Sequence, residues 1–297
     1  MRPTGRGGAG VAPETRAAIL AEAIPFIRRF ANKVVVVKYG GNALEGDGDE
    51  KAALRSFAED IVLMRAVGML PVVVHGGGPQ IGELMARLGM TPEFRDGLRV
   101  TDADTLDIAR MVLVGKVNRE IVDALNVHGP VALGLSGEDA GLITAALRDP
   151  ALGFVGDVAA VDSSILTRLI GEGLVPVIAT IGSDGAGQAY NINADTVAGA
   201  IAISLCCEKL IFLTDVTGIL ADRGDAQSLV AELGAGALGA MIGDGSIAEG
   251  MIPKAEACAA AVRSGVGSAH ILDGRVPHAL LLELLTEEGI GTMVVGR

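Results

Sequence analysis

The chain has 297 residues, half of them apolar and only 3% aromatic, and its 24 basic and 36 acidic residues give a formal net charge of −12. This length allows one large α/β domain, or two lobes on a continuous sheet, and argues against disorder as the default. The negative charge disfavours non-specific binding to nucleic acid or anionic lipid. We therefore expect no nucleic acid partner, and an anionic substrate would need locally placed cations.

The cysteines and residues 1–16 indicate the cellular compartment of the protein. Cys206, Cys207 and Cys258 give neither an even disulfide framework nor metal-ligand spacing, which favours a reducing compartment. Residues 1–16 lack the apolar segment of a signal peptide, and no apolar run approaches the ~18 residues of a membrane span. We expect a soluble cytoplasmic protein with no membrane partner and no dedicated metal site.

Residues 1–32 differ from the rest of the chain. A Gly-rich tail leads into the segment 14–31, where Leu20, Ile24 and Ile27 form an apolar stripe at helical spacing. Pro25 interrupts this segment and removes the hydrogen bond to the carbonyl of Ala21, so a kinked helix is predicted. Such a helix either packs on its own lobe or serves a partner subunit.

Beyond residue 32, short continuous apolar runs alternate with stretches of helical periodicity. Such runs are typical of strands covered on both faces, and helix-length connections imply right-handed crossovers and a mainly parallel sheet. Ligands on such sheets bind beyond the carboxyl ends of the strands. Strands are predicted at 34–37, 72–74, 131–135, 175–179, 210–213 and 269–272, and helices at 49–67, 79–88, 196–205 and 253–264.

Two glycine-rich loops follow predicted strands. Residues 75–79 end one strand and begin a helix, whose free N–H groups and dipole favour an anion, although a tight turn alone is an alternative. We interpret His75 as a core residue and not as a catalytic group. In the other loop, Lys38 directly follows four valines; it either extends to solvent or offers a point charge to a transferring phosphoryl group.

Polar residues also mark the starts of two predicted helices. Pro253 puts Lys254 in a first turn, where a cation opposes the helix dipole unless an anion binds. Asn193 is a typical N-cap and Asp195 favours the dipole. Between two lysines that converge on phosphate, however, Asp195 would also offset their mutual repulsion. The loop at 214–218 is either a nucleotide-binding loop or an ordinary turn.

Taken together and in this order, six segments resemble the amino acid kinase family. They are Lys-Tyr-Gly-Gly-Asn-Ala at 38–43, His-Gly-Gly-Gly-Pro-Gln at 75–80, Gly-Leu-Arg-Val-Thr at 97–101, Asn-Ile-Asn-Ala-Asp at 191–195, Asp-Val-Thr-Gly at 215–218 and Gly-Met-Ile-Pro-Lys at 250–254. The resemblance covers about residues 15–297. The third and sixth segments resemble the branch that phosphorylates N-acetyl-L-glutamate more than the aspartate, carbamate or uridylate kinases.

This resemblance implies a three-layer αβα sandwich on a mainly parallel central sheet, and transfer of the γ-phosphoryl group of ATP to a carboxylate. Residues 1–32 would be a flexible tail and a kinked oligomerisation helix. Residues 33–200 would form an N-terminal lobe for the acyl amino acid and for dimerisation. Residues 201–297 would form a C-terminal lobe for MgATP, with Mg²⁺ bound through the nucleotide.

The resemblance also implies roles for single residues. Lys38 and Lys254 match the lysines that stabilise the transferred phosphoryl group, Asp195 matches the carboxylate that organises them, and Arg99 matches the partner of the substrate α-carboxylate. The implied substrate-binding set is Gly76, Gly77, Gly78, Arg99, Asn191 and Asn193, and the implied nucleotide-binding set is Lys38, Gly40, Gly41, Gly77, Thr214, Asp215, Thr217, Gly218, Met251 and Lys254.

Features at both ends of the chain resemble the arginine-regulated members of this branch. The kinked helix resembles the extension that joins dimers into a ring-shaped hexamer, a trimer of dimers. Residues 270–275, 278–283 and 289–292 resemble the arginine-sensitive signature, which implies inhibition by L-arginine near Lys209, His270, Glu283 and Gly291. The resemblance leaves open whether a PII-type signalling protein binds.

Two alternatives are compatible with the same motifs. A related kinase could act on another carboxylate, such as an aminoadipate derivative, because one arginine and backbone amides do not fix the chain length of the acceptor. A non-catalytic nucleotide- or anion-binding protein could share the fold. The joint retention of Lys38, Asp195 and Lys254 argues against this second alternative.

Overall fold

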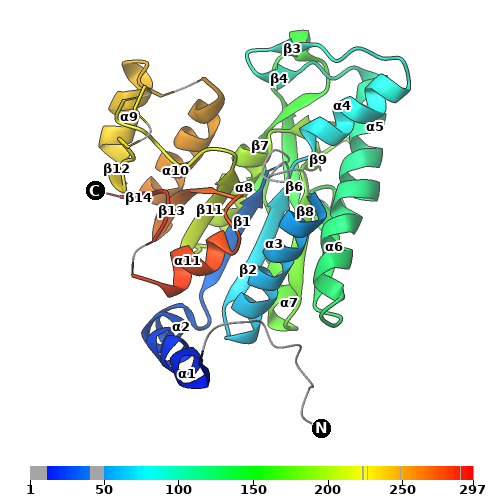
Figure 1. The fold of residues 1–297 in the computed structure, drawn as a ribbon. Helices are drawn as coiled ribbons and strands as arrows, with labels where there is room; N and C mark the ends of the chain where they lie inside the picture. Colours follow the sequence, from blue (N-terminus) through cyan, green and yellow to red (C-terminus); the bar gives the residue numbers. More distant parts are fainter. Residues whose placement is uncertain are drawn as a thin grey trace.

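The computed structural model describes residues 12–40, 50–222, 224–225, 227–247, 249–287 and 289–296. Its centre is an eight-stranded sheet with the strand order β12-β14-β13-β11-β1-β2-β8-β5 (Figure 1). Among the described strand pairs of this sheet, β13–β14 is antiparallel and the others are parallel. The strands are β1 (Val34–Tyr39), β2 (Leu70–His75), β5 (Ala132–Ser136), β8 (Val175–Ala179), β11 (Lys209–Thr214), β12 (Glu232–Gly234), β13 (Ser268–Asp273) and β14 (Thr292–Val295).

The side chains of the central strands enter two separate cores, one on each face of the sheet. In β1, Val35 and Val37 belong to one core and Val36 to the other, because successive side chains of a strand point to opposite faces. Both sets are fully buried. This double burial produces the continuous apolar runs from which six strands were predicted, and all six are confirmed.

Helices cover both faces, so the predicted αβα sandwich is confirmed. The first core receives side chains from α3, α4, α5, α6 and α11, and the second from α7, α8, α9 and α10. These helices are α3 (Glu50–Ala66), α4 (Gly78–Arg87), α5 (Ala103–Arg110), α6 (Asn118–Asn126), α7 (Ser164–Gly171), α8 (Ala194–Ser204), α9 (Ala235–Gly243), α10 (Ile252–Arg263) and α11 (Ala279–Leu285). A π-helix, Met111–Val117, joins α5 to α6, and short 3-10 turns occupy Asp139–Gly141, Pro150–Leu152 and Glu249–Met251.

Two small β-structures were not predicted. One is a hairpin of β3 (Phe94–Arg95) and β4 (Leu98–Arg99), seen at the top of Figure 1. The other is a small closed barrel of β6 (Ile143–Leu147), β7 (Val155–Val161), β9 (Ile181–Ser183) and β10 (Ala189–Ile192). Their strands are short or only partly buried, and although β7 contains one continuous apolar run, residues 158–161, this run was not predicted as a strand.

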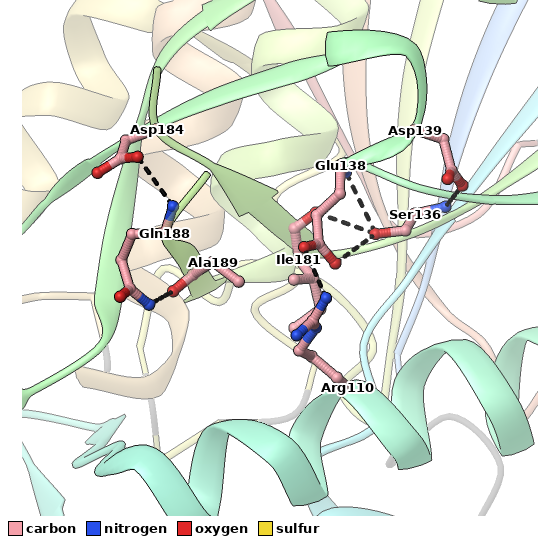
Figure 2. A network of polar contacts seen from close by, with 8 residues as sticks. All are labelled: Arg110, Ser136, Glu138, Asp139, Ile181, Asp184, Gln188 and Ala189. Carbon is pink, nitrogen blue, oxygen red and sulfur yellow. Dashed lines mark hydrogen bonds and ion pairs between the residues drawn. The ribbon is translucent and has the colours of Figure 1, made fainter. Parts of the chain in front are cut away.

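Polar contacts join this barrel to the edge of the main sheet (Figure 2). Ser136 at the end of β5 accepts a hydrogen bond from the backbone of Glu138, and its own hydroxyl lies 3.4 Å from the carbonyl oxygen of Ile181 in β9. Arg110 at the end of α5 forms an ion pair with Glu138. In the turn before β10, Asp184 accepts a hydrogen bond from the backbone of Gln188. The contact between Ser136 and Ile181 thus joins β9 of the barrel to the end of β5, and the hydrogen bond of Asp184 closes the turn that leads into β10, the strand that carries Asn191.

The N-terminal helix is bent as predicted. Helix α1 (Pro13–Glu22) ends at Ala23, and α2 (Ile24–Phe30) follows with Pro25 in its first turn, where proline is tolerated because it lacks only an N–H that has no partner there. Ile19, Leu20 and Ile24 are more than half exposed, whereas Phe30 is buried. The apolar stripe of Ile19, Leu20 and Ile24 is therefore not covered by the described part of its own chain.

In the parts of the chain that the structure describes, no helix is both long enough and apolar enough to cross a membrane.

Candidate active site

A cavity of about 680 Å³ lies beyond the carboxyl ends of β1, β2, β8 and β11. The chain places β2 on one side of β1 and β11 on the other, and ligands of parallel sheets bind at such reversals of strand order. Twelve of the predicted site residues line this single cavity, and they come from both predicted lobes: Lys38, Gly40, Gly76, Gly77, Gly78, Arg99, Asn191, Asn193, Asp195, Thr214, Asp215 and Lys254.

The buried carboxylate of Asp195 contacts two lysines that line this cavity. The Nζ atom of Lys38 lies 2.9 Å from Oδ1 of Asp195, and the Nζ atom of Lys254 lies 3.1 Å from Oδ2. All three side chains are at most 16% exposed. Two cations share one anion, so the cluster carries a net positive charge toward the cavity.

The ionisation of Asp195 depends on these lysines. Burial by itself raises the pKa of the carboxyl, but the charges of Lys38 and Lys254 and their hydrogen bonds outweigh that effect and hold the pKa below its ordinary value. The cost of burying three charges is thus offset by their mutual contacts.

The first turn of α8 fixes the orientation of Asp195. Asn193 caps the helix, and its Oδ1 accepts hydrogen bonds from the backbone N–H groups of Asp195 and Thr196 at 2.8 and 3.2 Å. The N-capping interpretation and the lysine-orienting interpretation are therefore compatible. The cap holds the carboxylate in the first turn, from which it reaches both lysines.

Glycines let the backbone approach the same point. A Cβ atom on Gly40 would lie 3.0 Å from the carbonyl oxygen of Leu213 and 3.2 Å from Nζ of Lys38. After β2, Gly77 is the N-cap of α4, whose first N–H groups have no partner within the helix. Backbone donors and lysine ammonium groups therefore surround one region, which suits a phosphate group.

Arg99 occupies another part of the wall. Its guanidinium donates to the carbonyl oxygen of Gly78 at 2.9 Å, lies 3.3 Å from Sδ of Met85 and stacks 4.7 Å above the ring of Phe94. Among the described residues, these contacts are all with neutral groups. Arg99 is only 9% exposed, and its burial lowers its pKa. A buried cation with neutral neighbours favours an anionic ligand.

The backbone and side chain of Thr101 connect Arg99 to Asn191. The Thr101 hydroxyl donates to the carbonyl oxygen of Arg99 at 2.9 Å and lies 3.4 Å from Nδ2 of Asn191. Sequence reasoning missed Thr180, which lines the cavity directly after β8 and could have been found from its place after a predicted strand. It also missed Phe94, Leu113 and Val155, for which the sequence contains no comparable signal.

Four members of the predicted nucleotide set are not among the residues that line this cavity, as far as the described chain extends. Gly41 lies outside the described residues. Thr217 lines a different cavity, and Gly218, with φ +144°, packs against Thr292. Met251 precedes α10 as its N-cap and packs against the second core. Their roles in nucleotide binding stay predictions.

The four predicted effector residues gather around a second cavity of about 790 Å³. His270 lies 2.8 Å from Oε1 of Glu283 through Nδ1 and 2.9 Å from Nζ of Lys209 through Nε2. Lys209, Glu283 and Gly291 line the cavity, whose other wall includes Phe26 and Arg29 of α2 and the ring of Phe30.

Burial shifts the pKa values of the ionisable groups in this cluster. It lowers the pKa of His270 and of Lys209. Burial alone would raise the pKa of Glu283, but its hydrogen bond with His270 and the charges of neighbouring groups keep the pKa below its ordinary value. Glu283 is therefore a carboxylate at neutral pH, held at the wall of an open cavity.

A model of the amino acid kinase family matches residues 33–273. The chain belongs to this family. An acetylglutamate kinase of Symbiobacterium thermophilum is 56% identical over 94% of this chain and 97% of its own length. The chloroplastic acetylglutamate kinase of Arabidopsis thaliana is 48% identical over 97% of this chain and 83% of its own length. Such relatives place this member of the family among the acetylglutamate kinases.

Solved structures agree with the family assignment. The N-acetylglutamate synthase of Neisseria gonorrhoeae, complexed with coenzyme A and N-acetyl-glutamate, has a TM-score of 0.81 and 29% identity, and the match covers 95% of this chain and 63% of that longer one. The carbamate kinase of Giardia lamblia bound to AMP-PNP has a TM-score of 0.66 at 17% identity, over 90% of this chain and 99% of its own. This second likeness concerns the fold alone.

His75 at the end of β2 generates a prediction about pH. It is fully buried, and burial lowers its pKa to about 4, against about 6.5 in an unfolded chain. The unfolded chain therefore binds more protons in this range, and stability falls as the pH drops from about 6.5 to about 4. Between pH 7.5 and 5.5 we expect His75 to account for a loss of about 1 kcal/mol in the free energy of unfolding.

Urea unfolding of the wild type and of His75→Asn at the two pH values measures this contribution, because the variant lacks the titrating group. The wild type should lose more stability on acidification than the variant. An identical loss in both proteins would contradict the prediction.

Proposed function

We propose that this acetylglutamate kinase family member transfers the γ-phosphoryl group of ATP to the side-chain carboxylate of N-acetyl-L-glutamate, the second step of arginine biosynthesis. A carboxylate oxygen of the acceptor forms a bond to the γ-phosphorus, the bond to the β-phosphate oxygen breaks, and ADP and N-acetyl-L-glutamyl 5-phosphate leave. The observation that carries this proposal is the buried Lys38–Asp195–Lys254 cluster at a cavity of suitable size.

The cluster is suited to charge stabilisation during this transfer. Phosphoryl transfer is catalysed mainly by positioning and by cations directed at the oxygens where charge accumulates. Two ammonium groups fixed on one carboxylate are already oriented, so little reorganisation is needed when the phosphoryl group moves. The acceptor carboxylate is itself the nucleophile at neutral pH, so the reaction requires no general base to activate it.

Arg99 supports an acceptor with a second carboxylate. Its planar guanidinium can bind a carboxylate through two parallel hydrogen bonds, and its present neighbours are neutral. Asn191, next to Thr101, could accept or donate a further hydrogen bond to the acyl amide. We therefore propose residues 33–200 as the acceptor lobe and residues 201–297, which supply Thr214, Asp215 and Lys254, as the nucleotide lobe.

We propose that Mg²⁺ enters with the nucleotide. Each oxygen of Asp195 already faces a lysine nitrogen, at 2.9 and 3.1 Å, so this donor set is suited to phosphate oxygens more than to a resident metal. When bound to the phosphates, the ion would supply additional neutralisation of charge.

L-Arginine is proposed as a feedback inhibitor that binds the second cavity. Glu283 offers a carboxylate for a guanidinium group, and the synthase of Neisseria gonorrhoeae has also been solved with coenzyme A and L-arginine, at a TM-score of 0.80 and 28% identity over 95% of this chain. The predicted cytoplasmic location stays a prediction, because the relative from Arabidopsis thaliana is named as chloroplastic.

The kinetic test distinguishes the role of Lys38 and Lys254 from the role of Arg99. Lys38→Ala and Lys254→Ala should each lower kcat by about 10²–10³-fold, because they remove charge stabilisation of the transferred group. Arg99→Ala should chiefly raise the KM for the acceptor, by about 10–100-fold, because it removes a charged hydrogen bond. ADP release is measured with N-acetylglutamate, aspartate, glutamate, carbamate and α-aminoadipate as acceptors.

Lys33→Ala is the matched control, since Lys33 is half exposed and pairs with Glu208 away from the cavity. Its kinetics should equal those of the wild type. Activity confined to another acceptor would refute the assigned substrate, and equal effects of the three variants on KM alone would refute the assigned roles.

The arginine test uses Glu283→Gln, which keeps the size of the side chain and removes its charge. The arginine concentration that halves activity should rise at least about 10-fold, because a buried charged partner is lost. Glu232→Gln in the same cavity is the control and should change inhibition little. Wild-type activity that is unaltered in millimolar arginine would refute the regulatory proposal.

The exposed stripe of α1 supports a hexamer, a trimer of dimers, because apolar side chains more than half exposed on one helix favour burial in a partner. Leu20→Glu should reduce the particle measured by light scattering from a hexamer to a dimer. Glu22→Gln on the same helix should leave the mass unchanged. A wild-type particle no larger than a dimer would contradict the proposal.

A further inference from the structure

His75 lies directly below the glycine loop of the active site, yet it does not line the cavity. It is the last residue of β2, its side chain is 0% exposed, and both its ring nitrogens have partners. Nδ1 lies 2.9 Å from the carbonyl oxygen of Gly76, and Nε2 lies 3.0 Å from Nδ2 of Asn118. The imidazole therefore connects the glycine loop to the start of α6.

These partners determine which nitrogen carries the proton. A carbonyl oxygen only accepts hydrogen bonds, so Nδ1 of His75 must be the donor to Gly76. Nε2 then has a free lone pair and accepts from Asn118. The Asn118 amide has only this orientation, because its Nδ2 also donates to the carbonyl oxygen of Val177 at 2.9 Å while Arg119 donates to its Oδ1.

The bond to Gly76 also sets the direction of the next N–H group. In a trans peptide, the carbonyl oxygen and the following N–H point in opposite directions, and the described chain has no cis peptide bonds. The Gly76 oxygen is held toward the buried imidazole. The N–H of Gly77, in the same peptide plane, therefore points away from His75, and Gly76 and Gly77 line the cavity whereas His75 does not.

The π-helix Met111–Val117, which precedes α6, packs against the same glycine loop. A Cβ atom on Gly77 would lie 2.7 Å from Cδ2 of Leu113 and 3.2 Å from Cγ2 of Val117, so both side chains pack directly on this glycine. The same stretch of helix then presents Asn118 to His75. Interruptions of an α-helix by π-geometry often occur at functional sites, and this one contacts the loop through both packing and hydrogen bonding.

We infer that His75 is a positioning residue, whose neutral imidazole, oriented by Asn118, holds the Gly76–Gly77 peptide so that the Gly77 N–H faces the phosphoryl group being transferred. This inference rests on the proposed function. It assigns His75 no contact with the substrate and no proton transfer. Burial keeps the ring neutral, since the pKa of about 4 lies well below the physiological range.

Two substitutions separate this role from simple core packing. His75→Leu approximates the volume of the ring but removes both hydrogen bonds. His75→Asn has an amide that can place a donor near the position of Nδ1, and so can still bond the Gly76 carbonyl. We expect His75→Leu to lower kcat at least about 10-fold and to weaken ATP binding, with the KM for the acceptor within about 3-fold of wild type, and His75→Asn to recover most of that loss.

A control variant accounts for general destabilisation. Leu166 is fully buried on α7, in the core on the opposite face of the sheet from Leu113 and Val117, and is not among the described residues that line the cavity. Leu166→Ala should lower the midpoint of thermal unfolding at least as much as His75→Leu while leaving kcat unchanged at a temperature where both variants are folded. If lower stability alone reduced kcat, Leu166→Ala and His75→Leu would both show a reduced kcat.

The proton position gives a readout that does not depend on activity. The chain has four histidines, so ¹⁵N-histidine labelling yields few ring signals, and the signals that are lost in His75→Asn identify His75. We expect a neutral ring protonated on Nδ1 and unprotonated on Nε2 at neutral pH. A proton on Nε2, an unchanged kcat in His75→Leu, or equal impairment of the Leu and Asn variants would overturn the inference.

Failure of the proposed function would be recognised separately. A wild-type chain that transfers no phosphoryl group to N-acetylglutamate would refute the acceptor assignment. Calorimetric titration of ATP into the wild type, His75→Leu and His75→Asn, together with the proton position, would then decide the role of His75. Tighter binding to the wild type and to the Asn variant than to the Leu variant supports it, and equal binding to all three overturns it.

Discussion

The contacts of Asp195 with Lys38 and Lys254 are the constraint on which the rest of the active site depends. Two ammonium groups close to each other repel, and their burial is tolerated because one carboxylate contacts both. The three residues come from the end of β1, the first turn of α8 and the first turn of α10. The cluster therefore requires that the sheet and both helices are assembled correctly before the site exists.

The two glycine loops lie next to this charged centre and line the same cavity. Gly40 leaves room for the Lys38 ammonium beside the backbone of β11, and the loop after β2 brings the N-terminus of α4 to the same cavity. Arg99 stands apart, on the β3–β4 hairpin, among neutral groups. The cavity thus has one region with lysines and backbone donors and another with a single guanidinium, a division that matches a nucleotide and a small carboxylate.

The sequence predicted six of the eight strands of the central sheet but not β12 and β14, and it indicated the charged centre through single residues whose roles the family resemblance then implied. Fully buried strands require continuous apolar runs, and a polar residue such as Lys38 at the end of such a run has few structural reasons to be there. The barrel strands, by contrast, are short or partly exposed, and the β3–β4 hairpin has only two-residue strands, so their sequence patterns are weaker than those of the central sheet. The π-helix keeps helical periodicity, and only the packing of Leu113 and Val117 on Gly77 distinguishes it. The family resemblance assigned Thr217 to the nucleotide site. Thr217 lines the second cavity, a location that depends on tertiary structure and not on local sequence.

The second cavity has a wall that belongs to α2, next to the exposed stripe of α1. A ligand in that cavity and a protein partner on that stripe would therefore act on the same bent helix. Binding equilibria that share an element are reciprocal: whatever assembly does to the ligand's affinity, the ligand does to assembly. In such an arrangement the sensitivity of the enzyme to its effector would depend on how much of the protein is present, so a dilute sample and a concentrated one need not respond alike.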